Sequence, residues 1–173
     1  EADNFEVCEL NLLNDDGWDN ALNKCDYLLH IASPCIVKEP HNENDIIIPA
    51  VRGTLRALKA AYKARVKKVV ITSSIGSIVY GHKKIVCCPN DWSNINFPLG
   101  AYIKSKTLAE KAAWDFVNQL ESPSFSMTSI NPGMVFGPLL SNQINSTSAS
   151  LILKIISGEF PALPNIYFSV VDV

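Results

Sequence analysis

The alternation of short apolar runs with longer segments of helical periodicity is the feature that most constrains the fold of this chain. Runs rich in β-branched and aliphatic residues occur at residues 26–32, 69–73 and 125–131, and helix-forming segments at residues 44–65 and 102–120 lie between them. This order is the sequence form of parallel strands joined by crossover helices. The sequence therefore predicts an α/β fold built on a parallel sheet.

Other segments extend the same pattern. We predict further strands at residues 5–10 and 166–171, and further helices at residues 18–25 and 146–157. The run at residues 26–32 is apolar almost throughout, which is typical of a strand that is covered on both faces of a parallel sheet. Residues 75–100 show little periodicity, and we expect a long loop there, a kind of segment that often carries function.

The helical segment at residues 44–65 contains Pro49 and Gly53. These two residues predict either a late start of the helix or a kink in it. The later turns place four apolar residues on one stripe, which we expect to face the core: Leu55, Leu58, Ala61 and Tyr62.

Composition argues against two classes of partner. Of the 173 residues, 47% are hydrophobic and 18% are charged, which indicates one globular unit that is long enough to bury a substantial core. The net charge of -2 provides no basic footprint for nucleic acid, and no apolar run reaches the length of a membrane span. We therefore expect neither nucleic acid nor a membrane as a partner.

The cysteines and histidines favour a reducing compartment. The five cysteines include no C-x-x-C pair, and free thiols in a cytoplasmic protein explain their odd number better than a disulfide framework does. His30 lies within an apolar run, where a hydrogen-bonded core histidine is the expected interpretation. The histidines show no ligand spacing, so we expect no bound metal.

Small or backbone-offering residues follow the predicted strands. In parallel sheets ligands bind beyond the carboxyl ends of the strands, where small residues let a flat cofactor approach. The same residues could simply close tight turns, but their recurrence at four ends favours a binding site. These ends are Asn11-Leu12, Ala32-Ser33, Ser73-Ser74 and Pro132-Gly133-Met134-Val135.

A tyrosine and a lysine lie four residues apart at Tyr102 and Lys106, at the start of a helix-forming segment. Residues at this spacing share a face only in a helix. The chain contains a second such pair, Tyr80 and Lys84, but Gly81 and the loop-like residues 88–90 argue against a helix there. A phenol and an ammonium near a serine hydroxyl provide what hydride transfer to a carbonyl needs for its proton.

The glycine-rich turn that would bind a pyrophosphate is absent. The eight glycines are scattered and form neither G-x-G-x-x-G nor G-x-x-G-x-x-G. Either the chain binds no dinucleotide, or it lacks the strand and helix that would carry this motif.

Several segments together resemble the extended short-chain dehydrogenase/reductases, most of all their dihydroflavonol-reductase-like branch. The resemblance covers nearly the whole chain, and its segments come in the right order. They are Leu29-His30-Ile31-Ala32-Ser33-Pro34, Gly53-Thr54-Leu55, Val70-Ile71-Thr72-Ser73-Ser74, Asp91-Trp92-Ser93, Tyr102-Ile103-Lys104-Ser105-Lys106-Thr107-Leu108-Ala109-Glu110 and Asn131-Pro132-Gly133-Met134-Val135-Phe136-Gly137-Pro138.

The resemblance implies a Rossmann-like, doubly wound parallel sheet. On this comparison residues 1–173 are the central part of a single NAD(P)-binding domain, and the substrate-binding region starts at about residue 138. The first βαβ unit and most of the C-terminal substrate lobe would be missing, so the sequence is expected to be an internal fragment or the ordered part of a longer chain.

The resemblance also implies catalytic roles for three residues. Tyr102 corresponds to the general acid, Lys106 to the cation that favours the phenolate and binds the nicotinamide ribose, and Ser74 to the serine that orients the substrate carbonyl. Ser73 and Ser77 compete with Ser74, which is preferred as the second serine after the strand.

The cofactor implied is NADP, with NAD possible. Besides Tyr102 and Lys106, the residues that correspond to cofactor contacts are Asn11, Leu12, Ile31, Ala32, Ser33, Pro132, Gly133, Met134, Val135 and Ser148. Relatives often carry Asp-Leu where this chain has Asn11-Leu12, so Asn11 is a departure that could alter adenine contacts.

Three functions follow as hypotheses. The first is an NAD(P)-dependent reductase of a ketone or aldehyde, acting as a monomer or homodimer on a small-molecule carbonyl or alcohol. The second is a nucleotide-sugar epimerase or dehydratase, or a hydroxysteroid dehydrogenase, that uses the same three residues. The third, of another class, is a non-catalytic cofactor sensor or scaffold, which is disfavoured because such proteins commonly lose the tyrosine or lysine.

Overall fold

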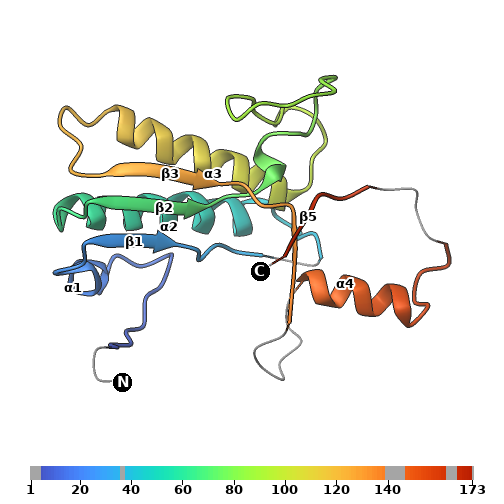
Figure 1. The fold of residues 1–173 in the computed structure, drawn as a ribbon, viewed down its shortest axis with the longest axis horizontal. Helices are drawn as coiled ribbons and strands as arrows, with labels where there is room; N and C mark the ends of the chain where they lie inside the picture. Colours follow the sequence, from blue (N-terminus) through green and yellow to red (C-terminus); the bar gives the residue numbers. More distant parts are fainter. Residues whose placement is uncertain (1–4, 36–37, 139–146, 163–166, 173) are drawn as a thin grey trace.

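The computed structural model of the chain describes residues 5–35, 38–138, 147–162 and 167–172. Its centre is a parallel sheet of three strands in the order β1 (Tyr27–His30), β2 (Lys68–Thr72) and β3 (Ser126–Ile130) (Figure 1). Each of these strands lies within one residue of a predicted run or inside it. The predicted α/β class and parallel, Rossmann-like sheet are confirmed.

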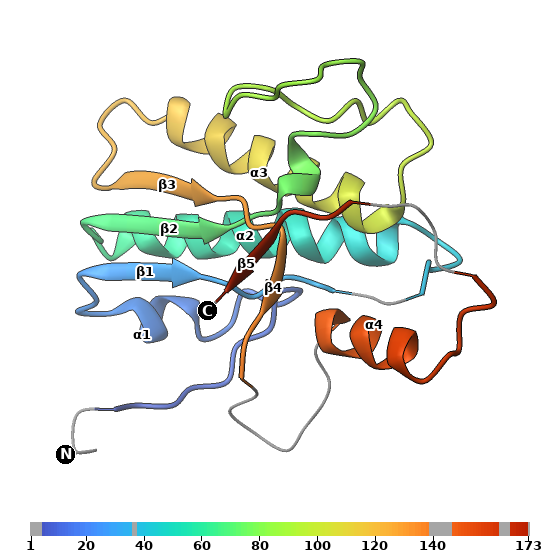
Figure 2. The same cartoon turned by 45° about the vertical axis from the view of Figure 1, so that its right-hand side comes forward.

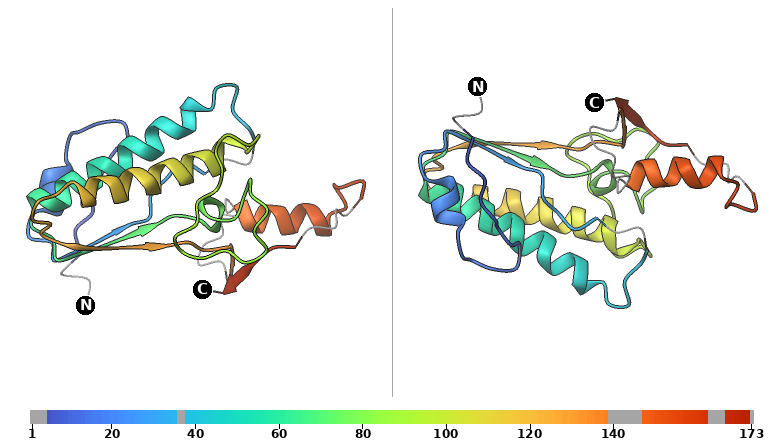
Figure 3. Two further views of the ribbon diagram at one scale, coloured as in Figure 1. Left: turned by 90° about the horizontal axis from the view of Figure 1, so that it is seen from above. Right: turned by 90° about the horizontal axis from the view of Figure 1, so that it is seen from below.

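Two long helices connect the strands. They are α2 (Asn44–Lys63) and α3 (Ala101–Asn118), and both lie on the same face of the sheet (Figure 3). The strand order advances in one direction and such crossovers are right-handed, so both helices must lie on one side. Because the three strands are parallel, their carboxyl ends meet at one edge of the sheet.

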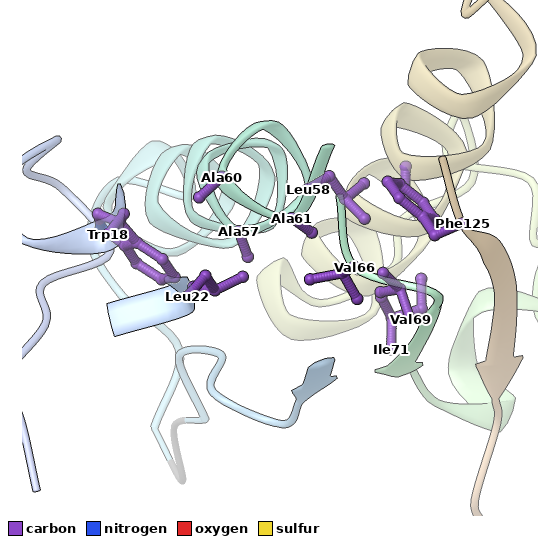
Figure 4. Close-up of a cluster of buried hydrophobic side chains, with 11 residues drawn as sticks. Trp18, Leu22, Ala57, Leu58, Ala60, Ala61, Val66, Val69, Ile71 and Phe125 are labelled. Atoms are coloured by element: carbon purple, nitrogen blue, oxygen red, sulfur yellow. The ribbon is translucent and has the colours of Figure 1, made fainter. Parts of the chain in front are cut away.

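The hydrophobic core lies between these helices and the sheet. Leu58 and Ala61 of α2 are fully buried against Val69 of β2, and Phe125 closes the core before β3 (Figure 4). Burying a leucine or valine side chain stabilises a fold by about 1.5–3 kcal/mol. The predicted stripe on α2 is thus confirmed at Leu58 and Ala61, whereas Tyr62 is 41% exposed.

A short helix, α1 (Trp18–Leu22), packs against the same core. Trp18 and Leu22 are both buried, as its predicted apolar face requires. The helix is shorter than the predicted segment because Lys24 adopts a positive φ of 64°, which helical backbone does not allow.

Helix α2 begins at Asn44, as the predicted segment does, and runs through Pro49, so of the two alternatives that Pro49 suggested, a late start or a kink, the late start is wrong. Proline removes one backbone hydrogen bond of the helix. Ile46 and Ala50, on either side of Pro49, are buried at 7% and 2% exposure, and this packing holds the first turns in place.

The predicted strand at residues 5–10 is wrong. These residues form no strand, and Phe5 and Val7 are 82% and 80% exposed. A strand requires a neighbour to share its hydrogen bonds, and none of the described strands pairs with residues 5–10.

The expectation that residues 26–32 are covered on both faces is also wrong within the described residues. Leu28 and His30 face α2 and α3, but Tyr27, Leu29 and Ile31 are exposed at 64%, 67% and 68%. Their alternation shows that helices cover one face of β1 and leave the other apolar face open.

Beyond the carboxyl edge of the sheet lies a second, smaller parallel pair (Figure 2). It consists of β4 (Met134–Phe136) and β5 (Val170–Asp172). Helix α4 (Thr147–Ile156) matches a predicted helix, and β5 lies in the predicted C-terminal strand segment except for its last residue. Strand β4 was not predicted, because its three residues directly follow the turn-forming Pro132 and Gly133.

Residues 75–100 form a loop that begins with one short 3-10 helix, η1 (Ile75–Ser77), as the lack of periodicity predicted. None of the helices in the described ranges has the length and apolar character needed to cross a membrane.

Candidate active site

Three side chains converge at the carboxyl edge of the sheet. Ser74 follows β2, while Tyr102 and Lys106 lie one turn apart at the start of α3. Tyr102 and Ser74 line the same cavity, and the Lys106 Nζ lies 6.0 Å from the centre of the Tyr102 ring. The structure thus brings together the three residues that sequence reasoning singled out for proton handling.

Lys106 is a buried cation with a defined partner. Its side chain is 7% exposed, and its ammonium donates a hydrogen bond of 3.0 Å to the backbone carbonyl of Thr72. Burial lowers the pKa of Lys106, while negative charge on Cys35 and on Glu110 opposes this shift.

The pKa of Tyr102 is raised above its ordinary value. Burial is the main cause, negative charge on Cys35 adds to it, and the nearby Ser74 hydroxyl opposes it. This direction differs from the one expected from the charge of Lys106, because removing the phenol from water disfavours the phenolate more than its polar neighbours favour it.

The structure separates Ser74 from its two competitors. Ser73 and Ser77 are buried, at 6% and 0% exposure, and Ser77 directs its hydroxyl to Glu110. Ser74 caps η1 by accepting a hydrogen bond of 3.1 Å from the backbone of Gly76, and it lines the same cavity as Tyr102. Of the three serines, only Ser74 lines that cavity.

The cavity in front of Tyr102 has a volume of about 360 Å³ and a mostly apolar wall, as is typical of small-molecule sites. It is formed by η1, the start of α3, β4, α4 and the chain before β5. The lining residues to which sequence reasoning gave no site role come from separate helices and loops, and no local pattern links them: Cys35, Ile75, Gly76, Val79, Tyr80, Ile103, Thr147, Tyr167, Phe168 and Ser169.

Six of the residues predicted to contact a cofactor lie beside the catalytic candidates or on the same edge. Ala32 and Ser33 line a small cavity together with Lys106. Gly133, Met134 and Ser148 line the larger one, and the Pro132 carbonyl accepts a hydrogen bond of 2.9 Å from Ile75. Ile31, directly after β1, is largely exposed.

Asn11, Leu12 and Val135 lie elsewhere. The Asn11 side chain accepts a hydrogen bond from the backbone of Leu13, and Leu12 packs closely over Gly53 of α2. Val135 is 37% exposed in β4 and lines neither of the two cavities. Within the described residues, these three make no contact with Tyr102 or Lys106.

The second tyrosine-lysine pair is not arranged in a helix. Residues 79–84 are irregular, and Lys84 pairs with Asp91. The predicted helix at Tyr102 and the predicted lack of one at Tyr80 are therefore confirmed, although Tyr80 also lines the cavity.

His30 is a core histidine, as predicted. It is 7% exposed, and its Nε2 lies 3.3 Å from the Thr54 hydroxyl. Burial, followed by the charge of Lys106, lowers the pKa of His30 to about 4, so the ring is neutral at physiological pH.

These residues fit the nicotinamide end of a dinucleotide. Small residues at the ends of β1 and β3 leave room for close approach, and one buried ammonium lies beside a phenol at the same edge. Among the described residues, no set of three or more histidines, cysteines and carboxylates gathers as metal ligands would.

A parallel Rossmann-like sheet with a serine, a tyrosine and a lysine at its carboxyl edge defines the extended short-chain dehydrogenase/reductases. The chain belongs to the 3-beta hydroxysteroid dehydrogenase/isomerase family, which matches residues 1–162. The resemblance drawn from the sequence is confirmed.

Individual relatives are reductases. The chain is 36% identical over 157 residues to dihydroflavonol 4-reductase of Arabidopsis thaliana, covering 86% of this chain and 40% of the relative. It is 37% identical over 179 residues to a cinnamoyl-CoA reductase of Medicago truncatula, covering 98% and 53%.

A solved structure of yeast methylglyoxal/isovaleraldehyde reductase Gre2 with NADPH is similar at a TM-score of 0.79 and 26% identity. That similarity covers 94% of this chain and 54% of the yeast chain. The chain thus spans about half the length of the relatives it matches.

Proposed function

We propose that the full-length protein is an NADP-dependent reductase of a ketone or aldehyde. The observation that carries this proposal is the convergence of three side chains at the carboxyl edge of a parallel sheet: Ser74 and Tyr102 line one cavity, and Lys106 lies one helical turn from Tyr102. The similarity to dihydroflavonol, cinnamoyl-CoA and methylglyoxal reductases supports it.

The three side chains divide the work on the carbonyl oxygen. When bound, the reduced nicotinamide supplies a hydride to the carbonyl carbon. The hydroxyls of Ser74 and Tyr102 both donate hydrogen bonds to the oxygen, where negative charge develops. The O–H bond of Tyr102 then breaks as the O–H bond of the alcohol product forms, and the ammonium of Lys106 stabilises the resulting phenolate.

The residues that would hold the cofactor are those gathered at this edge. Lys106, Ala32 and Ser33 lie on the side of β1 and β2, and Gly133, Met134 and Ser148 lie across the larger cavity. We propose NADP rather than NAD because solved relatives at 26% and 30% identity are NADPH complexes. NAD remains the alternative cofactor.

The proposal includes the organisation of the protein. Residues 1–173 would be the central part of one NAD(P)-binding domain, with the substrate region starting at about residue 138. Residues Thr147, Ser148, Tyr167 and Phe168 support this division, because they line the cavity opposite Tyr102. One chain supplies Ser74, Tyr102 and Lys106, which suits a monomer or homodimer, and the free cysteines suit the cytoplasm.

The family match favours one alternative, the oxidation of a hydroxysteroid. The same residues would run that reaction in reverse, with Tyr102 accepting the proton from the alcohol. Assays in both directions separate the two functions.

The test uses the full-length protein with NADPH or NADH and a panel of a dihydroflavonol, cinnamoyl-CoA, methylglyoxal and a 3-ketosteroid. We expect carbonyl-dependent oxidation of NADPH, and its loss in Tyr102→Phe with retained NADPH binding. Wild-type turnover in Tyr102→Phe, or no turnover with any carbonyl, would contradict the proposal.

A further inference from the structure

Glu110 is a buried carboxylate that the proposed mechanism does not use. It lies on α3 four residues after Lys106 and eight after Tyr102, so the three residues form one stripe of the helix. Its side chain is 6% exposed. A charge in this position is unfavourable unless partners compensate for the lost water, so its contacts indicate what it does.

Two hydrogen-bond donors approach one oxygen of Glu110. The Ser77 hydroxyl lies 2.6 Å from Oε2, and the Asn131 side-chain nitrogen lies 2.8 Å from the same atom. Burial alone would raise the pKa of Glu110, but the hydrogen bonds from Ser77 and Asn131 and the nearby hydroxyls of Ser73 and Ser129 outweigh it and lower the pKa. Glu110 is therefore ionised at neutral pH.

Both partners of Glu110 also reach Ser74. The Asn131 side-chain nitrogen lies 3.1 Å from the Ser74 carbonyl oxygen, and the Ser77 hydroxyl lies 2.8 Å from it. Ser77 has one proton to donate, and the charged carboxylate is the stronger acceptor. Asn131 then satisfies the Ser74 carbonyl, so Glu110 orients both groups around the backbone of Ser74.

We propose that Glu110 is a positioning residue for carbonyl reduction, holding Ser74 against Tyr102 through Asn131 and Ser77. Glu110 and Tyr102 belong to the same helix, α3. The hydrogen-bond network therefore fixes the position of Ser74 relative to the helix that carries the proposed general acid, Tyr102. The inference rests on the proposed function and adds a residue to it.

Ser93 provides a matched structural control. Its hydroxyl is buried, donates a hydrogen bond of 2.8 Å to the Gly76 carbonyl in the same turn, and accepts one of 2.8 Å from the backbone of Tyr80. Ser93→Ala therefore removes two buried hydrogen bonds next to Ser74 and leaves the side chains of the Glu110 network in place.

The experiment is a double-mutant cycle in the full-length protein, with Glu110→Met and Glu110→Gln made in the wild-type and Ser74→Ala backgrounds. We expect Glu110→Met to lower kcat by about tenfold or more in the wild type, because a small misplacement of a reacting group is costly. In Ser74→Ala the same change should lower kcat by less than about twofold, since the group it positions is gone. Glu110→Gln keeps the shape and serves if Glu110→Met fails to fold.

The KM for NADPH should change little in the Glu110 variants, and Ser93→Ala should lower the melting temperature without this dependence on Ser74. Equal losses of kcat in both backgrounds would overturn the role of Glu110. The proposed function would still stand if the wild type reduces carbonyls and Tyr102→Phe does not. No carbonyl reduction by the wild type would overturn both.

Discussion

Lys106 on α3 donates a 3.0 Å hydrogen bond to the backbone carbonyl of Thr72, the last residue of β2. This bond ties the helix that carries Tyr102 to the strand that precedes Ser74. A buried ammonium thereby serves the fold and the candidate active site at once, and its removal should affect both.

Lys106→Met should lower carbonyl reduction by about 10²-fold or more, because the cation that stabilises the phenolate is lost. Lys104→Met is the control on the same helix, since Lys104 makes a surface ion pair with Glu43 that is worth little. Steady-state kinetics of both variants check this. Similar activity of the two variants would contradict a special role for Lys106.

Cys35→Ser should shift the alkaline limb of the pH profile for reduction to lower pH. Reduction needs protonated Tyr102, and negative charge on Cys35 disfavours the phenolate and so raises the pKa of Tyr102. Removing that charge lowers the pKa, so the phenol loses its proton at a lower pH. The measurement is kcat/KM against pH, with the exposed Cys88 changed to serine as the control. A profile that is unchanged in Cys35→Ser would rule out this interaction.

Because His30 is buried as a neutral ring, the free energy of unfolding should decrease as the pH falls below 6.5. The pKa of His30 is about 4 in the folded state against 6.5 for the ordinary side chain, so the unfolded state binds the extra proton between these values. Its contribution to stability is complete above pH 6.5 and declines toward pH 4, by roughly 2 kcal/mol between pH 7 and pH 5. Denaturant unfolding at the two pH values should show a smaller decline in His30→Gln than in the wild type. Equal declines would count against a buried neutral ring.

Gly133→Ala should disturb the small sheet of β4 and β5. A Cβ atom at Gly133 would collide with the backbone of Ser169, which cannot move aside as a side chain could. Overpacking of this kind costs about 1–3 kcal/mol. At Gly100 a Cβ would meet the flexible end of the Glu39 side chain, so Gly100→Ala should cost less. Thermal unfolding of both variants makes the comparison, and equal melting temperatures would show that Ser169 does not constrain Gly133.

Local patterns were sufficient for the central elements. Hydrophobic periodicity located β2, β3 and α3, and helix context chose Tyr102 over Tyr80. Residues 5–10 misled because an apolar alternation shows that a segment could pair, not that a neighbour exists. The late helix start that Pro49 suggested does not occur, because buried neighbours on both sides keep the first turns of the helix in place.

By itself, the sequence determined the fold class, because helix and strand periods act over a few residues, and it indicated the family and the tyrosine-lysine pair through short motifs in a characteristic order. Only the tertiary structure showed that, of the three serines, Ser74 lines the cavity with Tyr102, and that Glu110 and Asn131 are hydrogen-bonded to each other behind it. Those contacts join segments separated by whole strands and helices, and no spacing along the chain encodes the distance between two side chains once the sheet has brought its carboxyl ends together.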